Sequence, residues 1–397
     1  MFKKTFLAIL TATGVLSFCQ ISHAQMFFEA DWVFMDRDND GDGNIVAGPE
    51  SLGLGNSDYD FSSGYRLILG GQLGCVDIDS SWTQLDTWES SDSGTFNGDV
   101  LFDDTAGGGF FPAGGNSLNR ALGLSQAATL VGAEIDETEF LRATDPMDAG
   151  YSPRWTSFSE SNYSDFELNI GTNRECRRWR ASVGYRHIEL DEMSGVTLGG
   201  FFDAVDAADG TPVGGQPNDQ LAGSSLAAVG FDPIVAGSLD GFATPAGPDS
   251  ILYQVRGDAS NELDGAQATF AGRLFDGDWV TIEGYGKAGI FHNNMHGSVG
   301  ETVVATGNGN AAYRRRLSDS EIGAAFAGNL GFTATVSLTD YINLVTGYEA
   351  LFLSGVALGP DQINGLSTNL LGNRRYSVEN DGSVIAHGGR LGLEILW

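Results

Sequence analysis

The sequence predicts an all-β protein: a transmembrane antiparallel up-and-down β-barrel of about ten strands, with short periplasmic turns and long external loops. Two observations carry this prediction. Apolar residues recur at every second position in about ten segments, which is the period of a strand with one apolar face. The connections between these segments then alternate between tight turns and long loops. A β-sandwich in water has no reason to sort its connections in this way.

Each segment sets an apolar face against a polar one. In the first, Phe28 and Trp32 share a face, and Glu29 and Asp31 share the opposite face. The first half of the chain supplies FFEADWVFM (27–35), YDFSSGYRLILGGQLG (59–74), VDIDSSWTQL (76–85), SDFELNIGT (164–172) and RWRASVGYRHIEL (178–190). The second half supplies DGAQATFAGRLF (264–275), WVTIEGYGKAGIF (279–291), GFTATVSL (331–338), YINLVTGYEALF (341–352) and VIAHGGRLGLEILW (384–397). No run of about 18 apolar residues follows the leader, so no spanning helix is expected.

The connections define the two ends of the barrel. Tight turns are expected at 75–77, 173–177, 276–278 and 339–341, and long loops at 36–57, 89–158, 192–250, 296–318 and 356–382. The last segment must pair with the first, because a closed barrel leaves no strand edge in lipid. Trp397 would then lie in the aromatic girdle. This ending also resembles the assembly signal of outer-membrane barrels, which predicts the barrel-assembly machinery as a partner of the C-terminal strand.

Residues 1–24 read as a signal peptide. Lys3 and Lys4 precede an apolar stretch, and a small-x-small site ends at Ala24. Residues 25–397 are therefore expected to form a single outer-membrane β-barrel domain, with outer-membrane lipid as its surroundings. The chain has 21 Lys and Arg against 52 Asp and Glu, a net charge of −31. This balance argues against nucleic acid as a partner and suits a surface that meets cations.

Several segments resemble a known family. ADWVFMDRDND, DFSSGYRLILGGQLG, SDFELNI, RASVGYRHIELDE and GAQATFAGRLF with IEGYGKAGIF are similar to the beta-barrel porin 7 family of planctomycete outer-membrane proteins. The resemblance runs in patches over most of residues 25–397 and leaves out the large loops. It implies a barrel fold and an outer-membrane location, and it implies no catalytic or binding residues.

The sharpest local motif is DRDNDGDGN at 36–44. Its alternating oxygens and glycine match the front of a calcium loop, which predicts a Ca²⁺ site at Asp38, Asp40, Asp42 and Asn44. The match then fails, because Pro49 occupies the position of the bidentate glutamate and Glu50 comes one residue late. A solvated acidic loop is the alternative interpretation. No other cofactor is expected.

The charges on the inward face leave two functions open. The expected inward bases are Arg66, Arg180, Arg186, Arg273, Lys287 and Arg390, and the expected inward acids are Glu29, Asp31, Asp165, Glu167, Glu283, Glu349 and Glu394. They could line a passive porin-like channel for small polar solutes or ions. They could equally form a salt-bridged plug, because barrels of about eight strands are filled by their own side chains. The alternative function is therefore a non-conducting structural or surface-recognition barrel that acts through its external loops.

An enzyme is not expected. His187, His292, His296 and His387 lie outside any nucleophile motif such as G-x-S-x-G, and HNNMH at 292–296 is interpreted as a strand end. The two cysteines beyond the leader, Cys75 and Cys176, both map to the short-turn end. The strand map spaces them by about 10 Å or more, whereas a disulfide needs Cα atoms within about 7 Å, so their pairing stays open.

Overall fold

The computed structural model describes residues 25–39, 44–46, 52–54, 59–95, 139–143, 154–172, 178–206, 231–235, 249–306, 311–364, 366–368 and 374–397. The wall strands are β1 (Gln25–Asn39), β4 (Ser62–Leu73), β5 (Val76–Leu85), β8 (Arg154–Thr172), β9 (Trp179–Asp206), β11 (Asp249–Asp276), β12 (Val280–Thr306), β13 (Ala311–Ser337), β14 (Ile342–Val356) and β17 (Gly382–Leu396). The shorter elements are β2 (Asn44–Val46), β3 (Leu52–Gly53), β6 (Trp88–Thr95), β7 (Glu139–Ala143), β10 (Asp232–Val235), α5 (Gly359–Asn364), β15 (Leu366–Thr368) and β16 (Arg374–Tyr376).

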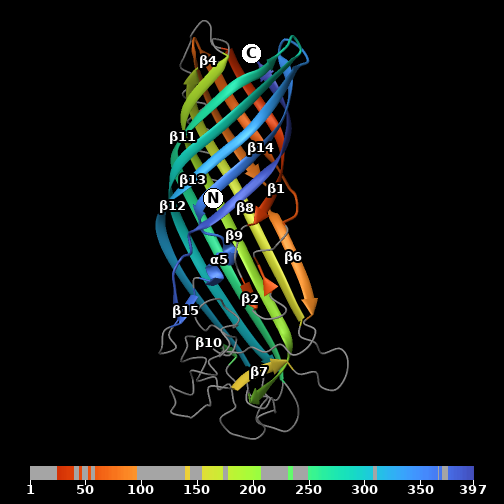
Figure 1. The fold of residues 1–397 in the computed structure, drawn as a ribbon, viewed down its shortest axis with the longest axis vertical. Helices are drawn as coiled ribbons and strands as arrows, with labels where there is room; N and C mark the ends of the chain where they lie inside the picture. The colour runs from red at the N-terminus through yellow and green to blue at the C-terminus, as the bar shows by residue number, and fades with distance from the viewer. Residues whose placement is uncertain are drawn as a thin grey trace.

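The ten wall strands form a closed ring (Figure 1). Each pairs antiparallel with the next wall strand along the chain, and β17 pairs with β1. At the end of this seam the amide N of Met26 donates to the carbonyl O of Trp397 at 3.0 Å, and the amide N of Trp397 donates back to Met26 at 3.0 Å. The expected fold, strand number and closure are therefore confirmed.

The tight turns gather at the end of the barrel that also holds the C-terminus (Figure 1). β4 turns into β5 at Gly74 and Cys75, and Gly74 takes a φ of 64°, which a glycine adopts without strain. The turns after β11 and β13 lie at 277–279 and 338–341. Three of the four expected turns are thus confirmed, and the fourth, at 173–177, lies outside the described residues. In this fold the short-turn end faces the periplasm.

Around this end the outward side chains form an apolar belt. Its large exposed members include Trp32, Phe34, Leu168, Ile170, Val183, Phe270, Ile290, Leu330, Phe332, Phe352, Leu391, Leu393 and Ile395. Aromatic residues mark the edge of the belt nearest the tight turns, which we call the lower edge although Figure 1 draws this end at the top. There Trp179 stacks on Phe270 with ring centroids 5.4 Å apart, and Trp279 and Trp397 are exposed. An apolar belt with aromatic girdles is what a strand-built membrane protein presents to lipid.

On β11 and β12 the belt ends within one outward position. On β11 the outward residues change from Ala266 to Asp264, and on β12 they change from Ile290 to His292. Asp264 is paired with His292, so the change falls at one level on neighbouring strands. We take this level as the upper limit of the membrane-spanning segments. Among the described residues, the structure contains no helix with the length and hydropathy to cross a membrane.

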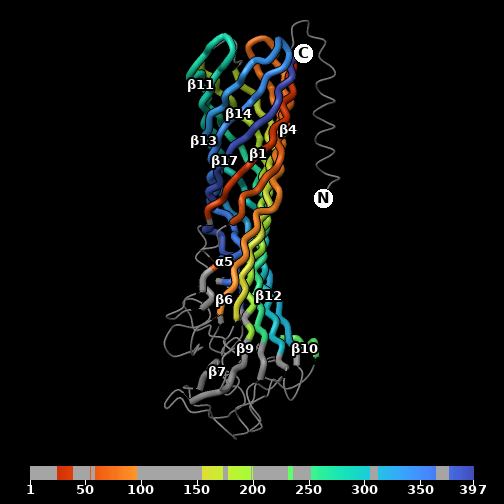
Figure 2. The backbone as a smooth tube through the Cα atoms, turned by 90° about the vertical axis from the view of Figure 1, so that its right-hand side faces the viewer, coloured from red at the N-terminus to blue at the C-terminus, as the bar shows by residue number. Residues whose placement is uncertain are grey.

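Four strands continue far beyond the belt. β9 and β11 have 28 residues each and β12 and β13 have 27 each, whereas about 9–11 residues span a bilayer. β14 and β1 stop at Val356 and Asn39, so the extended wall consists of β6, β8, β9, β11, β12 and β13 (Figures 1 and 2). Strands extend into several of the expected loops, which were therefore wrong in extent. β7, the start of β8 and all of β6 but Trp88 lie within 89–158, β9 covers 192–206 of the expected loop 192–250, and β12 and β13 cover all of 296–318 except 307–310.

Candidate functional site: the barrel lumen

A polar cavity of about 440 Å³ occupies the lumen at the short-turn end. It arises because the inward positions of the strands here carry charged and hydroxyl side chains while the outward positions meet lipid. Its charged lining residues are Glu29, Arg66, Asp77, Asp79, Glu167, Arg180, Arg273, Glu283, Lys287, Arg390 and Glu394. Both signs of charge are present, so the cavity suits polar contents.

Ion pairs close the cavity on its inner side. Arg66 pairs with Glu349, which also accepts the hydroxyl of Tyr285 at 2.6 Å. Lys287 reaches both carboxylate oxygens of Glu167 at 2.8 Å. β4, β14, β12 and β8 supply these four charged groups, so the contacts cross the lumen rather than follow one strand pair.

Arg390 joins two acids of β1. Its Nη1 lies 2.9 Å from Glu29 Oε1 and 2.6 Å from Asp31 Oδ2, and its Nη2 donates to Thr333 at 2.6 Å. Asp31 faces Gly392 on β17, where an added Cβ would lie 2.0 Å from Asp31 Oδ1. Glycine at 392 therefore leaves the space in which the Asp31 carboxylate sits.

Arg186 makes the most complete set of contacts. Its Nε and Nη2 donate to the two oxygens of Asp165 at 3.0 and 2.8 Å, and its Nη1 donates to Asn329 at 2.8 Å. The Tyr163 hydroxyl donates to the same carboxylate at 3.2 Å. A bidentate guanidinium–carboxylate pair of this kind fixes geometry strongly.

An apolar layer fills the lumen above these ion pairs. Inward side chains from most wall strands meet there and are almost completely buried: Val33, Met35, Leu85, Ile188, Leu190, Leu263, Phe291, Ala325, Ala327, Leu351, Leu353, Val384 and Ala386. Trp88 of β6 joins them and donates its indole N–H to the Met35 carbonyl at 3.1 Å. Their near-zero exposure means that solvent does not reach these side chains from either end of the lumen.

The chain between β14 and β17 returns into the barrel above this layer. α5 contacts β9, β11 and β12, and Figure 1 shows it among these strands. Asn261 holds its start, donating to the Ala357 carbonyl at 2.8 Å and accepting the Ala357 N–H at 2.7 Å. Asn293 donates to the Gly355 carbonyl at 3.0 Å. We call residues 355–364 the plug segment.

A buried ion pair lies beside the plug segment. Arg37 of β1 pairs with Glu192 of β9, and both side chains have zero exposure. Glu192 also accepts the Gly359 N–H at 3.0 Å. Burial alone would lower the pKa of Arg37, but the Glu192 charge, the Tyr59 hydroxyl and the hydrogen bond to Glu192 together outweigh it and raise the pKa. The guanidinium also lies over the Tyr59 ring, 4.7 Å from its centroid. Arg37 is therefore held as a cation.

The expected inward charges reach the lumen, and the ion pairs confirm the salt-bridged arrangement for most of them. Sequence reasoning missed Asn261, Asn293, Glu192 and the plug segment. Asn293 lies within HNNMH, which was wrongly interpreted as a strand end and lies inside β12. Only a longer period-two reading, with inward Asn293 and Met295 between outward histidines, could have placed it.

The calcium expectation is untested. Asp38 is exposed at the end of β1 and Asn44 begins β2, whereas Asp40 and Asp42 lie outside the described residues. No cluster of three or more potential metal-ligating side chains occurs in the part of the chain that the structure describes. Cys75 is exposed at its turn, and Cys176 also lies outside the described residues, so their pairing stays open.

No protein-family model matches the chain, and no curated protein matches it. Among solved structures, it is similar to the outer membrane protease OmpT from Escherichia coli, with 12% identity, coverage of 94% of this chain and 96% of that one, and a TM-score of 0.29. It is also similar to the toluene transporter TodX from Pseudomonas putida (9% identity, coverage 96% and 91%, TM-score 0.20). A third is an anion-selective porin from Comamonas acidovorans (8%, coverage 94% and 99%, TM-score 0.20). Likeness at this level says nothing about activity.

Proposed function

We propose that the protein is an outer-membrane β-barrel whose lumen is closed to solutes and whose extramembrane part performs recognition. The single observation that carries this proposal is the filling of the lumen in three successive layers. Ion pairs, an apolar layer and the plug segment follow one another along the barrel axis. A closed lumen leaves the exterior as the working surface.

The form of the wall supports this proposal. A barrel that served only to cross the bilayer would need strands of about 9–11 residues. Here β11 has 28, and its outward positions beyond the belt carry polar and charged side chains such as Glu262 and Arg256. The extended wall therefore holds a large polar surface well clear of the membrane.

A porin-like channel for small polar solutes or ions is the second candidate. The cavity of about 440 Å³ at the short-turn end favours it, since its lining carries charges of both signs. A channel function requires the side chains of the apolar layer and the plug segment to move out of the lumen. Acids outnumber bases among the charged lining residues of the cavity, so an opened lumen would favour cations over anions.

Planar-bilayer recording of the refolded protein tests the two candidates. The closed barrel is expected to give no stepwise conductance. The variant Phe291→Ala with Leu353→Ala is the control for insertion into the bilayer. Removing these two side chains leaves cavities in the apolar layer, so an inserted variant should conduct ions. Conductance steps from this variant but not from the native protein support the closed barrel. Stable conductance steps from the native protein would contradict the closed barrel and support the channel. A reversal potential measured in a salt gradient would then give the ion preference of that channel.

The proposal includes the route to the membrane. Residues 1–24 direct export as a signal peptide, and β17 is the segment that the barrel-assembly machinery recognises. It assigns the protein no catalytic step.

A further inference from the structure

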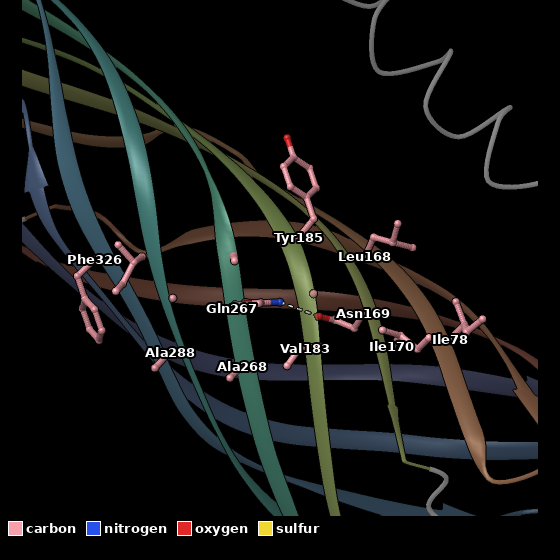
Figure 3. Close-up of a pocket in the computed structure, with 14 residues that line it drawn as sticks. Ile78, Leu168, Asn169, Ile170, Val183, Tyr185, Gln267, Ala268, Ala288 and Phe326 are labelled. Carbon is pink, nitrogen blue, oxygen red and sulfur yellow. Dashed lines mark hydrogen bonds between the residues drawn. The ribbon is translucent and has the colours of Figure 1, made fainter.

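A lipid-facing groove runs along the outside of the barrel over β8, β9, β11 and β12. Its volume is about 970 Å³. Figure 3 shows Ala268, Ala288 and Val183 on neighbouring strands, with Leu168 and Ile170 on one side and Phe326 on the other. The groove exists because three outward positions are alanines, Ala266, Ala268 and Ala288, where the flanking strands carry large side chains.

The strand registers close the groove at both ends. Below Ala268 the next outward residue of β11 is Phe270, stacked on Trp179 of the aromatic girdle. Above Ala266 the next is Asp264, which is paired with His187 on one side and His292 on the other. The groove therefore spans the apolar belt from the girdle to the polar rim.

The polar rim above the groove is acidic. Asp264 is exposed, and its Oδ1 accepts contacts from Tyr185 and from His187 Nδ1, the latter at 2.9 Å. The other ring nitrogen of His187 lies 3.4 Å from Glu189 Oε1, so His187 bridges these two acids. One outward step higher, Glu189 of β9 directly faces Glu262 of β11. Like charges on directly opposed residues repel each other, so this pair favours a cationic group between or above them.

We propose that the groove binds one membrane phospholipid, with a hydrocarbon chain along the alanine floor and an amine-bearing headgroup at the acidic rim. The groove is continuous with the belt that meets lipid, so hydrocarbon is the material next to it. The rim adds charge complementarity: three carboxylates, from Asp264, Glu189 and Glu262, outnumber the two imidazoles of His187 and His292 at the level at which headgroups lie. An ammonium group is attracted there, and a purely anionic headgroup is repelled.

Filling the groove tests the site for the chain. The protein is placed in nanodiscs of mixed phosphatidylethanolamine and phosphatidylglycerol, extracted in mild detergent, and examined by native mass spectrometry. Ala268→Phe with Ala288→Phe fills the groove with apolar atoms that lipid tolerates. Ala30→Phe on β1 is the matched control, since Ala30 also faces outward within the belt but lies away from the groove. We expect one retained phospholipid on the native protein and on the control, and none on the filled variant.

Neutralising the rim tests the headgroup. In Asp264→Asn with Glu262→Gln, the lipid is expected to remain bound, while the preference for phosphatidylethanolamine over phosphatidylglycerol disappears. Equal retention by the filled variant and the control would show general lipid coating and overturn the proposal. A preference of the native protein for phosphatidylglycerol would overturn it also. So would a native dimer that the filled variant alone dissociates, because the groove would then hold a second copy.

Discussion

Asn261 satisfies both backbone hydrogen-bonding groups of Ala357, donating to its carbonyl at 2.8 Å and accepting its N–H at 2.7 Å. The Asn261 side chain is fully buried on β11, and Ala357 begins the return of the chain into the barrel. One wall residue thus fixes the position of the plug segment.

Replacing this residue should release the plug segment. In Asn261→Ala, two buried backbone groups lose their partner, and each costs about 1–3 kcal/mol when left unsatisfied. We expect faster hydrogen exchange at residues 355–364 and a lower denaturant midpoint. Asn294→Ala is the control, because Asn294 is exposed on the outside of β12. Equal exchange in the two variants would mean that Asn261 does not hold the segment.

Removing one partner of the buried ion pair between Arg37 and Glu192 should destabilise the protein more than removing both charges. In Glu192→Gln, Arg37 becomes an uncompensated buried cation, which costs about 3–5 kcal/mol. Replacing both residues, by Arg37→Met with Glu192→Gln, removes that cation and should restore much of the loss. Urea unfolding in micelles measures each variant, and Glu262→Gln on the exposed face is the control. A double variant less stable than Glu192→Gln would contradict this account.

The sequence predicts the membrane part of this fold well. Lipid outside and polar groups inside impose a strict period of two, so Glu29, Asp31 and Trp32 could be assigned to faces without a structure. The tight turns could be located for the same reason, because the pattern stops where the strand leaves the bilayer.

Beyond the belt the same reasoning fails for a physical reason. The outer face of β12 meets water from His292 onward, so both faces become partly polar and the alternation fades. Strand continuation there depends on pairing with β11 and β13, which is a non-local property. The plug segment is harder still. The six residues of α5 carry no periodic signal. Asn261, which holds the plug segment, lies about a hundred residues earlier in the chain.

The calcium motif gives a prediction about the loop after β1. If Asp38, Asp40 and Asp42 bind Ca²⁺, the cation should order this loop, since bound carboxylates no longer repel one another. Limited proteolysis should then be slower with calcium than with chelator. The difference should vanish when the three residues are changed to asparagine and persist in Asp92→Asn, an exposed acid of β6. Identical cleavage of the native protein in both conditions would leave a solvated acidic loop.

The stability with which α5 is held in place should depend on pH, because Gln362 of α5 contacts the backbone of Glu379. Gln362 of α5 donates to the Glu379 carbonyl at 2.9 Å and accepts the Glu379 N–H at 3.2 Å. Burial, followed by the nearby charges of Asp381 and Glu321, raises the pKa of the Glu379 carboxyl above its ordinary value of 4.5. A raised carboxyl pKa means that the folded state binds the proton more tightly than the unfolded state. Its contribution to stability is therefore full below about pH 4.5 and is lost as the pH rises through the folded pKa.

Hydrogen exchange of α5 across this range measures the effect. We expect slower exchange at the acidic end in the native protein, after correction for the intrinsic exchange rate. Glu379→Gln removes the ionisable group and keeps the backbone contacts to Gln362, so its protection should no longer change through this carboxyl. Asp232→Asn on β10 is a control, because that acid is exposed and lies on another element. If the native protein and Glu379→Gln show the same pH dependence, Glu379 does not couple protonation to the position of α5.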